Sequence, residues 1–307
     1  MSMDDRDGVI WSDGKLLPWR DAKVHLLTHT LHYGMGVFEG IRAYNTARGT
    51  AIFKLEAHTR RFLNSARILG MPLDYDYQAL FDATVEVVRK NGLESGYIRP
   101  MAYFGSESMG LHAADLKSHI MIAAWPWGSY LGEEKLASGL RAKISSFTRH
   151  HVNISMCQAK ANGHYLNSLL AVNEAVQCGY DEAILLDSQG FVAEGSGENI
   201  FLVHDNTLYT PETTAALNGI TRNTIIDLAR DHGYEVKIKR ITRDELYIAD
   251  EVFFTGTAAE VTPIREIDNR VIGTGSRGPV TEKLQSAYFD IVQGRNPDYT
   301  HWLTYLD

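Results

Sequence analysis

The chain has 307 residues, of which 44% are hydrophobic and 22% charged, a composition typical of a globular protein large enough for two domains. Its net charge of −8 at pH 7 argues against nucleic-acid binding, and the acidic N-terminal segment Met1–Gly8 does not resemble a signal peptide. With two cysteines and no apolar run long enough to span a bilayer, we expect a cytoplasmic protein that binds no membrane.

The first half of the chain predicts a mixture of strands and helices. Val9–Trp11 and Lys15–Leu17 flank the turn residues Ser12–Gly14, which is the pattern of a β-hairpin. Gly36–Tyr44 predicts a buried strand, with Thr50–Lys54 as its partner. Helices are expected over Glu56–Leu69 and Tyr77–Lys90, and further strands over Tyr97–Phe104 and His119–Trp125.

A boundary between two domains is predicted near the middle of the chain. The segment Pro126–Glu134 has no hydrophobic periodicity and contains proline and glycine, which indicates an interdomain linker. We therefore predict a smaller N-terminal α/β domain over residues 1–125, the linker over 126–134, and a larger C-terminal domain over 135–307 that contains Lys160.

The C-terminal half predicts a strand at Leu140–Phe147 and then a helix at His164–Gln177. Helical spacing places four residues of that helix on one face: Tyr165, Leu169, Val172 and Val176. Further strands are expected at Glu182–Leu186, Phe191–Ala193, Asn199–Val203, Thr207–Thr210, Val236–Ile241 and Glu251–Thr255, and helices at Thr221–His232 and Pro279–Val292. Hairpins mixed with helices favour an α+β fold over a doubly wound sheet.

One lysine is distinguished by its neighbours. Lys160 lies among Ala159, Ala161 and Gly163, and side chains this small would let a flat cofactor approach. A lysine that forms a Schiff base must be neutral when it attacks the aldehyde. The alternative is a solvated surface lysine in a closely packed loop.

A carboxylate that could accompany such a cofactor lies at Glu194. A carboxylate opposite a pyridine nitrogen keeps that nitrogen protonated, which makes the ring an electron sink. Gly195–Gly197 would leave the backbone open to a ligand. Glu198 is the competing carboxylate, but Glu194 ends a predicted strand and would be held more firmly. Tyr165 could bond the ring hydroxyl, or it could be a core tyrosine.

Two backbone segments could bind a phosphate group. Gly219, Ile220 and Thr221 open a predicted helix, whose first N–H groups favour an anion. Thr257 follows a predicted strand and offers a hydroxyl and an amide. Arg61 would add the countercharge, unless it is a surface residue.

Longer stretches together resemble the class IV (fold-type IV) pyridoxal-phosphate aminotransferases, and most closely the branched-chain-amino-acid aminotransferases. They are HYGMGVFEGIRAY (His32–Tyr44), YIRP (Tyr97–Pro100), AAWPWGSYLG (Ala123–Gly132), the Lys160 stretch, EGSGENIF (Glu194–Phe201), LNGITR (Leu217–Arg222) and FFTGTAAEVTPI (Phe253–Ile264). The resemblance implies an α+β fold like that of D-amino-acid aminotransferases, with pyridoxal 5′-phosphate at the interface of two domains.

The resemblance also implies roles for individual residues. Lys160 would be the catalytic Schiff-base lysine, Glu194 would face the ring nitrogen, and Tyr165 the ring hydroxyl. The phosphate group would be bound by Arg61, Gly219, Ile220, Thr221 and Thr257. The substrate would be bound by Tyr33, Phe38, Arg42, Tyr97, Arg99, Trp127, Tyr130, Thr257, Ala258 and Ala259.

The implied reaction transfers an amino group from leucine, isoleucine or valine to 2-oxoglutarate, giving branched-chain 2-oxo acids and glutamate by ping-pong kinetics. The implied assembly is a homodimer or a dimer of trimers. Alternatives within the family are a D-amino-acid aminotransferase, an (R)-amine transaminase and an aminodeoxychorismate lyase.

Two alternatives lie outside the aminotransferases. A non-catalytic binding protein of the same fold would be expected to lack Lys160 or Glu194, and this chain has both. A metal enzyme could use His25, His29 and His32, whose spacing fits one helical face, but no acidic pattern accompanies them. We therefore expect no metal site.

Overall fold

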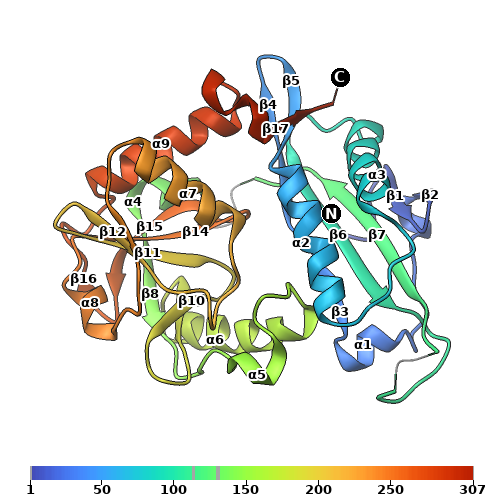
Figure 1. The fold of residues 1–307 in the computed structure, drawn as a ribbon, viewed down its shortest axis with the longest axis horizontal. Helices are drawn as coiled ribbons and strands as arrows, with labels where there is room; N and C mark the ends of the chain where they lie inside the picture. Colours follow the sequence, from blue (N-terminus) through green and yellow to red (C-terminus); the bar gives the residue numbers. More distant parts are fainter. Residues whose placement is uncertain (1, 113–114, 129–131, 307) are drawn as a thin grey trace. The chain divides into compact units, whose positions relative to one another are not determined.

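The computed structural model describes residues 2–112, 115–128 and 132–306 of the chain (Figure 1). By its contacts the chain forms two compact units, each with its own sheet. The first comprises Met1–Gly128, Ala159–Gly163 and Val292–Asp307, and the second comprises Ser129–Gln158 and His164–Ile291. Within the described residues, every helix is too short or too polar to cross a lipid bilayer.

The first unit has a sheet in the order β17-β5-β4-β6-β7-β1-β2, with β3 also paired to β6. Its strands are β1 (Val9–Ser12), β2 (Lys15–Pro18), β3 (Gly36–Phe38), β4 (Ile41–Thr46), β5 (Gly49–Phe53), β6 (Gly96–Phe104), β7 (Ser118–Trp125) and β17 (Leu303–Tyr305). Its helices are α1 (His29–Tyr33), α2 (Leu55–Ile68) and α3 (Tyr77–Lys90). The helices α2 and α3 lie side by side, and α3 packs on β1, β6 and β7 (Figure 1).

The predicted strand over Gly36–Tyr44 is divided into β3 and β4. The interruption falls at Glu39 and Gly40, where the N–H of Glu39 still bonds the carbonyl of Pro100 at 2.8 Å. The side chain of Glu39 is fully buried and bonded to two residues of α2. The charged side chain of Glu39 therefore points into the first unit. The alternation of inward- and outward-facing side chains that a continuous strand would have is interrupted there.

The second unit has a mixed sheet in the order β10-β9-β8-β15-β14-β11-β12-β13, with β16 paired to β15. Its strands are β8 (Leu140–Ile144), β9 (Glu182–Leu186), β10 (Val192–Gly195), β11 (Asn199–His204), β12 (Thr207–Thr210), β13 (Val236–Ile238), β14 (Glu251–Gly256), β15 (Glu260–Ile267) and β16 (Arg270–Val271). Its helices are α4 (Glu133–Ser138), α5 (Val152–Ser155), α6 (Tyr165–Gln177), α7 (Ile220–Asp231), α8 (Arg243–Tyr247) and α9 (Pro279–Val292). The mixed topology agrees with the predicted α+β class.

The two units differ from the predicted domains in the segments that they contain. The segments Ala159–Gly163 and Val292–Asp307, which were predicted to belong to the C-terminal domain, pack with the first unit instead. The backbone of Ala161 forms a bridge with Val37 of β3, and β17 completes the sheet beside β5. Lys160 therefore belongs to the first unit by its contacts. The helix α4 also begins inside the predicted linker 126–134.

The face of α6 that carries Leu169 and Val176 is not the face that the fold buries. The buried residues of the helix are Ser168, Ala171 and Ala175. In contrast, Leu169 is 56% exposed and Val176 58% exposed. The helix packs against β8 and β9 of the second unit through its small residues, since these allow close approach, and its larger apolar side chains point outward.

Candidate functional site

The peptide group of Lys160 is fixed on both sides. Its N–H donates a hydrogen bond to Oγ of Ser65 at 3.0 Å, and its carbonyl accepts one from the N–H of Phe38 at 3.0 Å. Ser65 is fully buried on α2, and Phe38 ends β3. The side chain of Lys160 therefore starts from a rigid backbone, as a group that reacts with a ligand requires.

A chain of contacts links several predicted substrate residues to Lys160. The centre of the Phe38 ring is 4.9 Å from Nζ of Lys160 and 4.5 Å from Cζ of Arg99. Nη2 of Arg99 donates to the hydroxyl of Tyr97 at 3.1 Å. The ring of Tyr97 packs edge-on against Trp127, with 4.6 Å between centroids. Within the first unit these side chains combine aromatic surface with two cations.

Arg61 is held by a buried carboxylate, that of Glu39, which no sequence pattern singled out. Its Nε and Nη2 donate to the two oxygens of Glu39 at 2.6 and 2.9 Å, and Nδ1 of His58 lies 2.7 Å from the same group. Burial alone would raise the pKa of Glu39, but the charge of Arg61 and the contacts of His58 lower it overall. Burial also lowers the pKa of His58. Arg61 is thus held in place by an anionic partner.

Glu194 is buried near the end of β10 and accepts hydrogen bonds at both oxygens. Oε1 lies 2.7 Å from Nε and 2.6 Å from Nη2 of Arg149. Oε2 accepts from the N–H of Leu217 at 3.1 Å and from Nδ2 of Asn199 at 3.4 Å. The competing carboxylate, Glu198, instead bonds the N–H of Gly197 in its own turn at 3.1 Å.

The predicted phosphate-binding segment Gly219–Thr221 opens α7. Gly219 is the N-cap residue, and no side chain caps this end of the helix. A Cβ atom on Gly219 would lie 1.8 Å from Oδ1 of Asn199, so only glycine allows this close approach. The backbone amides and the dipole of a 12-residue helix therefore offer a site for an anion.

The remaining predicted residues of the second unit lie at element ends. Thr257–Ala259 connect the antiparallel strands β14 and β15, and the carbonyl of Ala259 accepts a bond from Thr262 at 2.6 Å. Thr257 and Ala258 are half-buried. Tyr165 is the first residue of α6 and is also half-buried.

The other predicted substrate residues of the N-terminal part have different surroundings. Tyr33, at the end of α1, is 42% exposed and packs against His29. Arg42 is buried and donates to the carbonyl of Gly128 at 2.8 Å, so it contacts the start of the predicted linker. Tyr130 lies outside the described residues.

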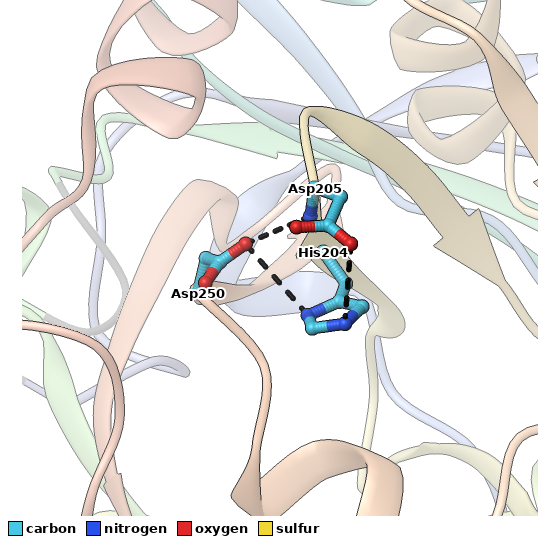
Figure 2. A group of neighbouring side chains, drawn as sticks. All are labelled: His204, Asp205 and Asp250. Atoms are coloured by element: carbon cyan, nitrogen blue, oxygen red, sulfur yellow. Dashed lines mark hydrogen bonds and ion pairs between the residues drawn. The ribbon is translucent and has the colours of Figure 1, made fainter.

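The histidines considered for a metal bond backbone groups instead. Nε2 of His29 lies 2.7 Å from the carbonyl of Gly110, Nε2 of His32 lies 2.9 Å from that of Leu26, and His25 accepts from a backbone N–H. A different cluster, His204, Asp205 and Asp250, is shown in Figure 2. All three are exposed, and the turn after β11 accounts for their proximity, since the N–H of Asp205 bonds Oδ2 of Asp250 at 2.9 Å.

Comparison with known proteins decides the family. The model of the amino-transferase class IV family matches residues 36–267, a range that includes Lys160 and Glu194. The chain belongs to the class IV aminotransferases. It is 64% identical to a branched-chain-amino-acid aminotransferase of Pseudomonas aeruginosa over 99% of both chains.

Solved branched-chain aminotransferases have the same fold. The enzyme of the thermophilic archaeon Thermoproteus uzoniensis, determined with norvaline, matches with a TM-score of 0.94 and 46% identity, over 98% of this chain and 100% of that chain. The enzyme of Thermobaculum terrenum, determined in its pyridoxal-phosphate form, matches with a TM-score of 0.92 and 37% identity, over 98% of this chain and 99% of that chain.

The family assignment draws attention to residues that sequence reasoning missed. Arg149, Asn199, Glu39 and His58 are all buried and contact predicted site residues. Asn199 stands inside the EGSGENIF stretch, five residues after Glu194, and could have been selected there. Arg149 gave only a weak signal, because it precedes two histidines in what resembles a polar loop.

Proposed function

We propose that this class IV aminotransferase transfers the amino group of branched-chain L-amino acids to 2-oxoglutarate, with pyridoxal 5′-phosphate as cofactor. One observation carries the proposal: a lysine whose peptide is fixed on both sides lies beside Phe38, whose ring contacts Arg99, in a chain that matches branched-chain enzymes over nearly its whole length.

The residues fit this cofactor. The uncapped start of α7, with Gly219 required for close approach, suits a phosphate group. Glu194, with Arg149 beside it, suits a ring nitrogen that carries a proton. Arg61 would contribute charge to the phosphate, while Thr257 and Tyr165 would supply hydroxyl groups to the phosphate and to the ring.

When bound, pyridoxal 5′-phosphate supplies an aldehyde that condenses with amines and a ring that accepts electrons released at the substrate's Cα. Lys160 would hold the cofactor through its amine. Once the incoming amino acid frees that amine, it would move a proton from Cα of the substrate to C4′ of the cofactor, acting as base and then as acid. The second substrate runs the same proton transfers in reverse, which gives ping-pong kinetics.

The side chains near Lys160 suit both substrates. The rings of Phe38, Tyr97 and Trp127 offer apolar surface to an aliphatic chain. Arg99 offers a cation to a second carboxylate such as that of glutamate. Because an apolar pocket discriminates by only about 1–3 kcal/mol per methylene, we expect leucine, isoleucine and valine all to react.

A half-reaction tests the proposal. The protein is loaded with cofactor and mixed with one donor in the absence of an acceptor, and the loss of visible absorbance is followed. L-leucine, D-alanine and (R)-1-phenylethylamine are compared in parallel. Bleaching by L-leucine supports the branched-chain assignment. If L-leucine were inert and D-alanine or the amine bleached the protein, the substrate assignment would change to the class of that donor. A protein that stays colourless with added cofactor would refute the cofactor.

We also propose that the chain self-associates through the outer face of α6. This face carries Leu166, Leu169, Leu170 and Val176, which are 42–65% exposed. An apolar face of this kind marks an interaction surface. Light scattering should give a multiple of the chain mass of 34.4 kDa. The double variant L166S/L169S should lower that mass, and V271S, which changes an equally exposed residue on β16, should not.

We also propose that the protein works in a reducing, cytoplasmic compartment, because neither of its two cysteines forms a disulfide. Cys157 is buried and Cys178 exposed, and both are free thiols.

A further inference from the structure

The first turn of α7 contains a buried cation. Arg222 is the third residue of this helix and is only 4% exposed, and the first turn has no acidic residue. The positive end of the helix dipole lies at the same terminus, where a carboxylate is favourable and a cation is unfavourable. Arg222 therefore adds its charge to a helix end that is already positive.

The hydrogen bonds of Arg222 do not compensate this charge. Nε donates to Oγ1 of Thr210 at 3.2 Å, Nη2 to the carbonyl of Pro211 at 3.0 Å, and Nη1 to Oδ1 of Asn223 at 3.3 Å. All three acceptors are neutral, and none of the described carboxylates forms an ion pair with Arg222. Burial lowers the pKa of Arg222 to about 10, so the side chain keeps its charge at neutral pH.

A buried cation is costly unless an anion lies close to it. Within the chain the candidate is Glu212, which lines the same hollow as Arg222, but its side chain is exposed to solvent. The amides of Gly219–Thr221 immediately precede Arg222 and suit a phosphate group. A phosphate monoester carries a charge of about −1.5 to −2 at pH 7. Such a group would compensate both the dipole of α7 and the charge of Arg222.

We propose that Arg222 belongs to the phosphate-binding site, where its positive charge strengthens binding of the phosphate ester at the start of α7. This inference rests on the proposed cofactor. Its consequence is that position 222 needs a cation, whereas the particular hydrogen bonds of the guanidinium group contribute little to cofactor affinity. The buried charge is then unfavourable in the chain alone and becomes favourable when the phosphate group binds.

The affinity for pyridoxal 5′-phosphate tests this inference. The full-length chain is freed of cofactor and titrated with it at neutral pH, and the visible absorbance of the bound aldehyde is followed. R222Q removes the charge, whereas R222K keeps the charge and loses the planar fork that reaches Thr210 and Pro211. We expect R222Q to weaken the affinity about tenfold, as one well-placed charge at a helix end can, and R222K to stay within about twofold of the native chain.

Two controls separate the charge from a structural effect. Pyridoxal, which lacks the phosphate group, is titrated in parallel and should not distinguish R222Q from the native chain. R230Q is the matched variant, because Arg230 is an exposed cation in the last turn of the same helix. It should keep the native affinity for pyridoxal 5′-phosphate. A purely structural role for Arg222 would weaken both ligands alike, and it would affect R222K as much as R222Q.

Native affinity for pyridoxal 5′-phosphate in R222Q would overturn the inference, and so would an equal loss in R222Q and R222K. The proposed function would survive either result if L-leucine still bleaches the native chain. A native chain that does not bind the cofactor would instead remove the function as well. If R222Q does not fold, as judged by circular dichroism, R222K decides. Near-native affinity in R222K then supports the role of the charge, and a loss of about tenfold refutes it.

Discussion

The N–H of Phe38 donates to the carbonyl of Lys160 at 3.0 Å, and the ring of Phe38 lies 4.9 Å from Nζ of the same lysine. Backbone and side chain of one residue thus contact backbone and side chain of the other. Because Phe38 ends β3 and is buried, the position of Lys160 is set by the sheet of the first unit rather than by its own loop.

Replacing Lys160 with alanine should remove the reactive amine without disturbing this backbone contact. We expect K160A to bind cofactor without the visible absorbance of the native protein, and its half-reaction with L-leucine to slow by about 10²–10⁴-fold, the usual contribution of a positioned acid–base group. Borohydride reduction followed by peptide mass spectrometry should label Lys160 in the native chain. K90A, at the exposed end of α3, is the control, and label at another lysine would contradict the assignment.

The Glu39–Arg61 pair should contribute strongly to stability. Removing one partner of a buried ion pair leaves the other charge uncompensated, so E39Q should lower the free energy of unfolding by about 3–5 kcal/mol in urea at neutral pH. The pKa of Glu39 is lower in the folded chain than in the unfolded chain. Its contribution to stability is therefore fully present above the unfolded pKa and is lost as the pH falls through the folded pKa. The difference between native and E39Q should therefore shrink on acidification. Glu56 is exposed on α2, the helix that carries Arg61, so E56Q should change the free energy of unfolding little. An equally small effect of E39Q would refute the role of the pair.

Local signals predicted much of the fold, and distant contacts account for what was missed. The helix α3 has the predicted bounds Tyr77–Lys90, because its apolar spacing, the capping side chain of Asp76 and the stop at Asn91 are all local. The break at Glu39 depends on Arg61, 22 residues away, and Glu194 depends on Arg149, 45 residues away. Ion pairs between residues this far apart in the chain leave no periodic pattern in the sequence from which they could be predicted.

The face of α6 illustrates a second limit. Helical spacing grouped Leu169 and Val176 correctly on one side, but the fold buries the side with Ala171 and Ala175. Hydrophobic spacing shows which residues share a face and does not show what covers that face. Larger apolar side chains that face outward on a helix are typical of an interaction surface. Hydrophobic spacing within one chain does not distinguish such a surface from a face that packs on the core.

Gly40 is expected to be intolerant of a side chain. A Cβ atom there would lie 2.0 Å from the hydroxyl oxygen of Tyr97, which is buried and packs against Trp127. G40A should displace Tyr97 and break its bond with Arg99. We expect retained cofactor absorbance, a stability loss of about 1–3 kcal/mol, and kcat/KM for L-leucine reduced by about a hundredfold through misplacement of the pocket. In G128A the added Cβ would have no atom of the described residues within 4 Å, so its kinetics should be native. Native kinetics in G40A would show that Tyr97 can move without consequence.

Glu182 should make stability depend on pH in the opposite sense from Glu39. It is buried at the start of β9, and burial raises its pKa despite hydrogen bonds from the N–H of Ala183 and the hydroxyl of Ser196. Between the unfolded and the raised folded pKa, the folded chain binds more protons than the unfolded chain. The contribution of Glu182 to stability is therefore fully present below its unfolded pKa and is lost as the pH rises through its folded pKa.

The variant E182Q mimics the protonated acid and cannot lose that proton. Urea unfolding should be measured from about pH 4.5 upward. The free energy of unfolding of E182Q should rise relative to that of the native chain by up to about 1.4 kcal/mol per pH unit, until the pH passes the folded pKa of Glu182. E212Q, which changes an exposed carboxyl group, should follow the native curve. Parallel curves for E182Q and the native chain would mean that Glu182 is ionised in the fold at neutral pH. The buried end of β9 would then have to stabilise a negative charge beside Ser196.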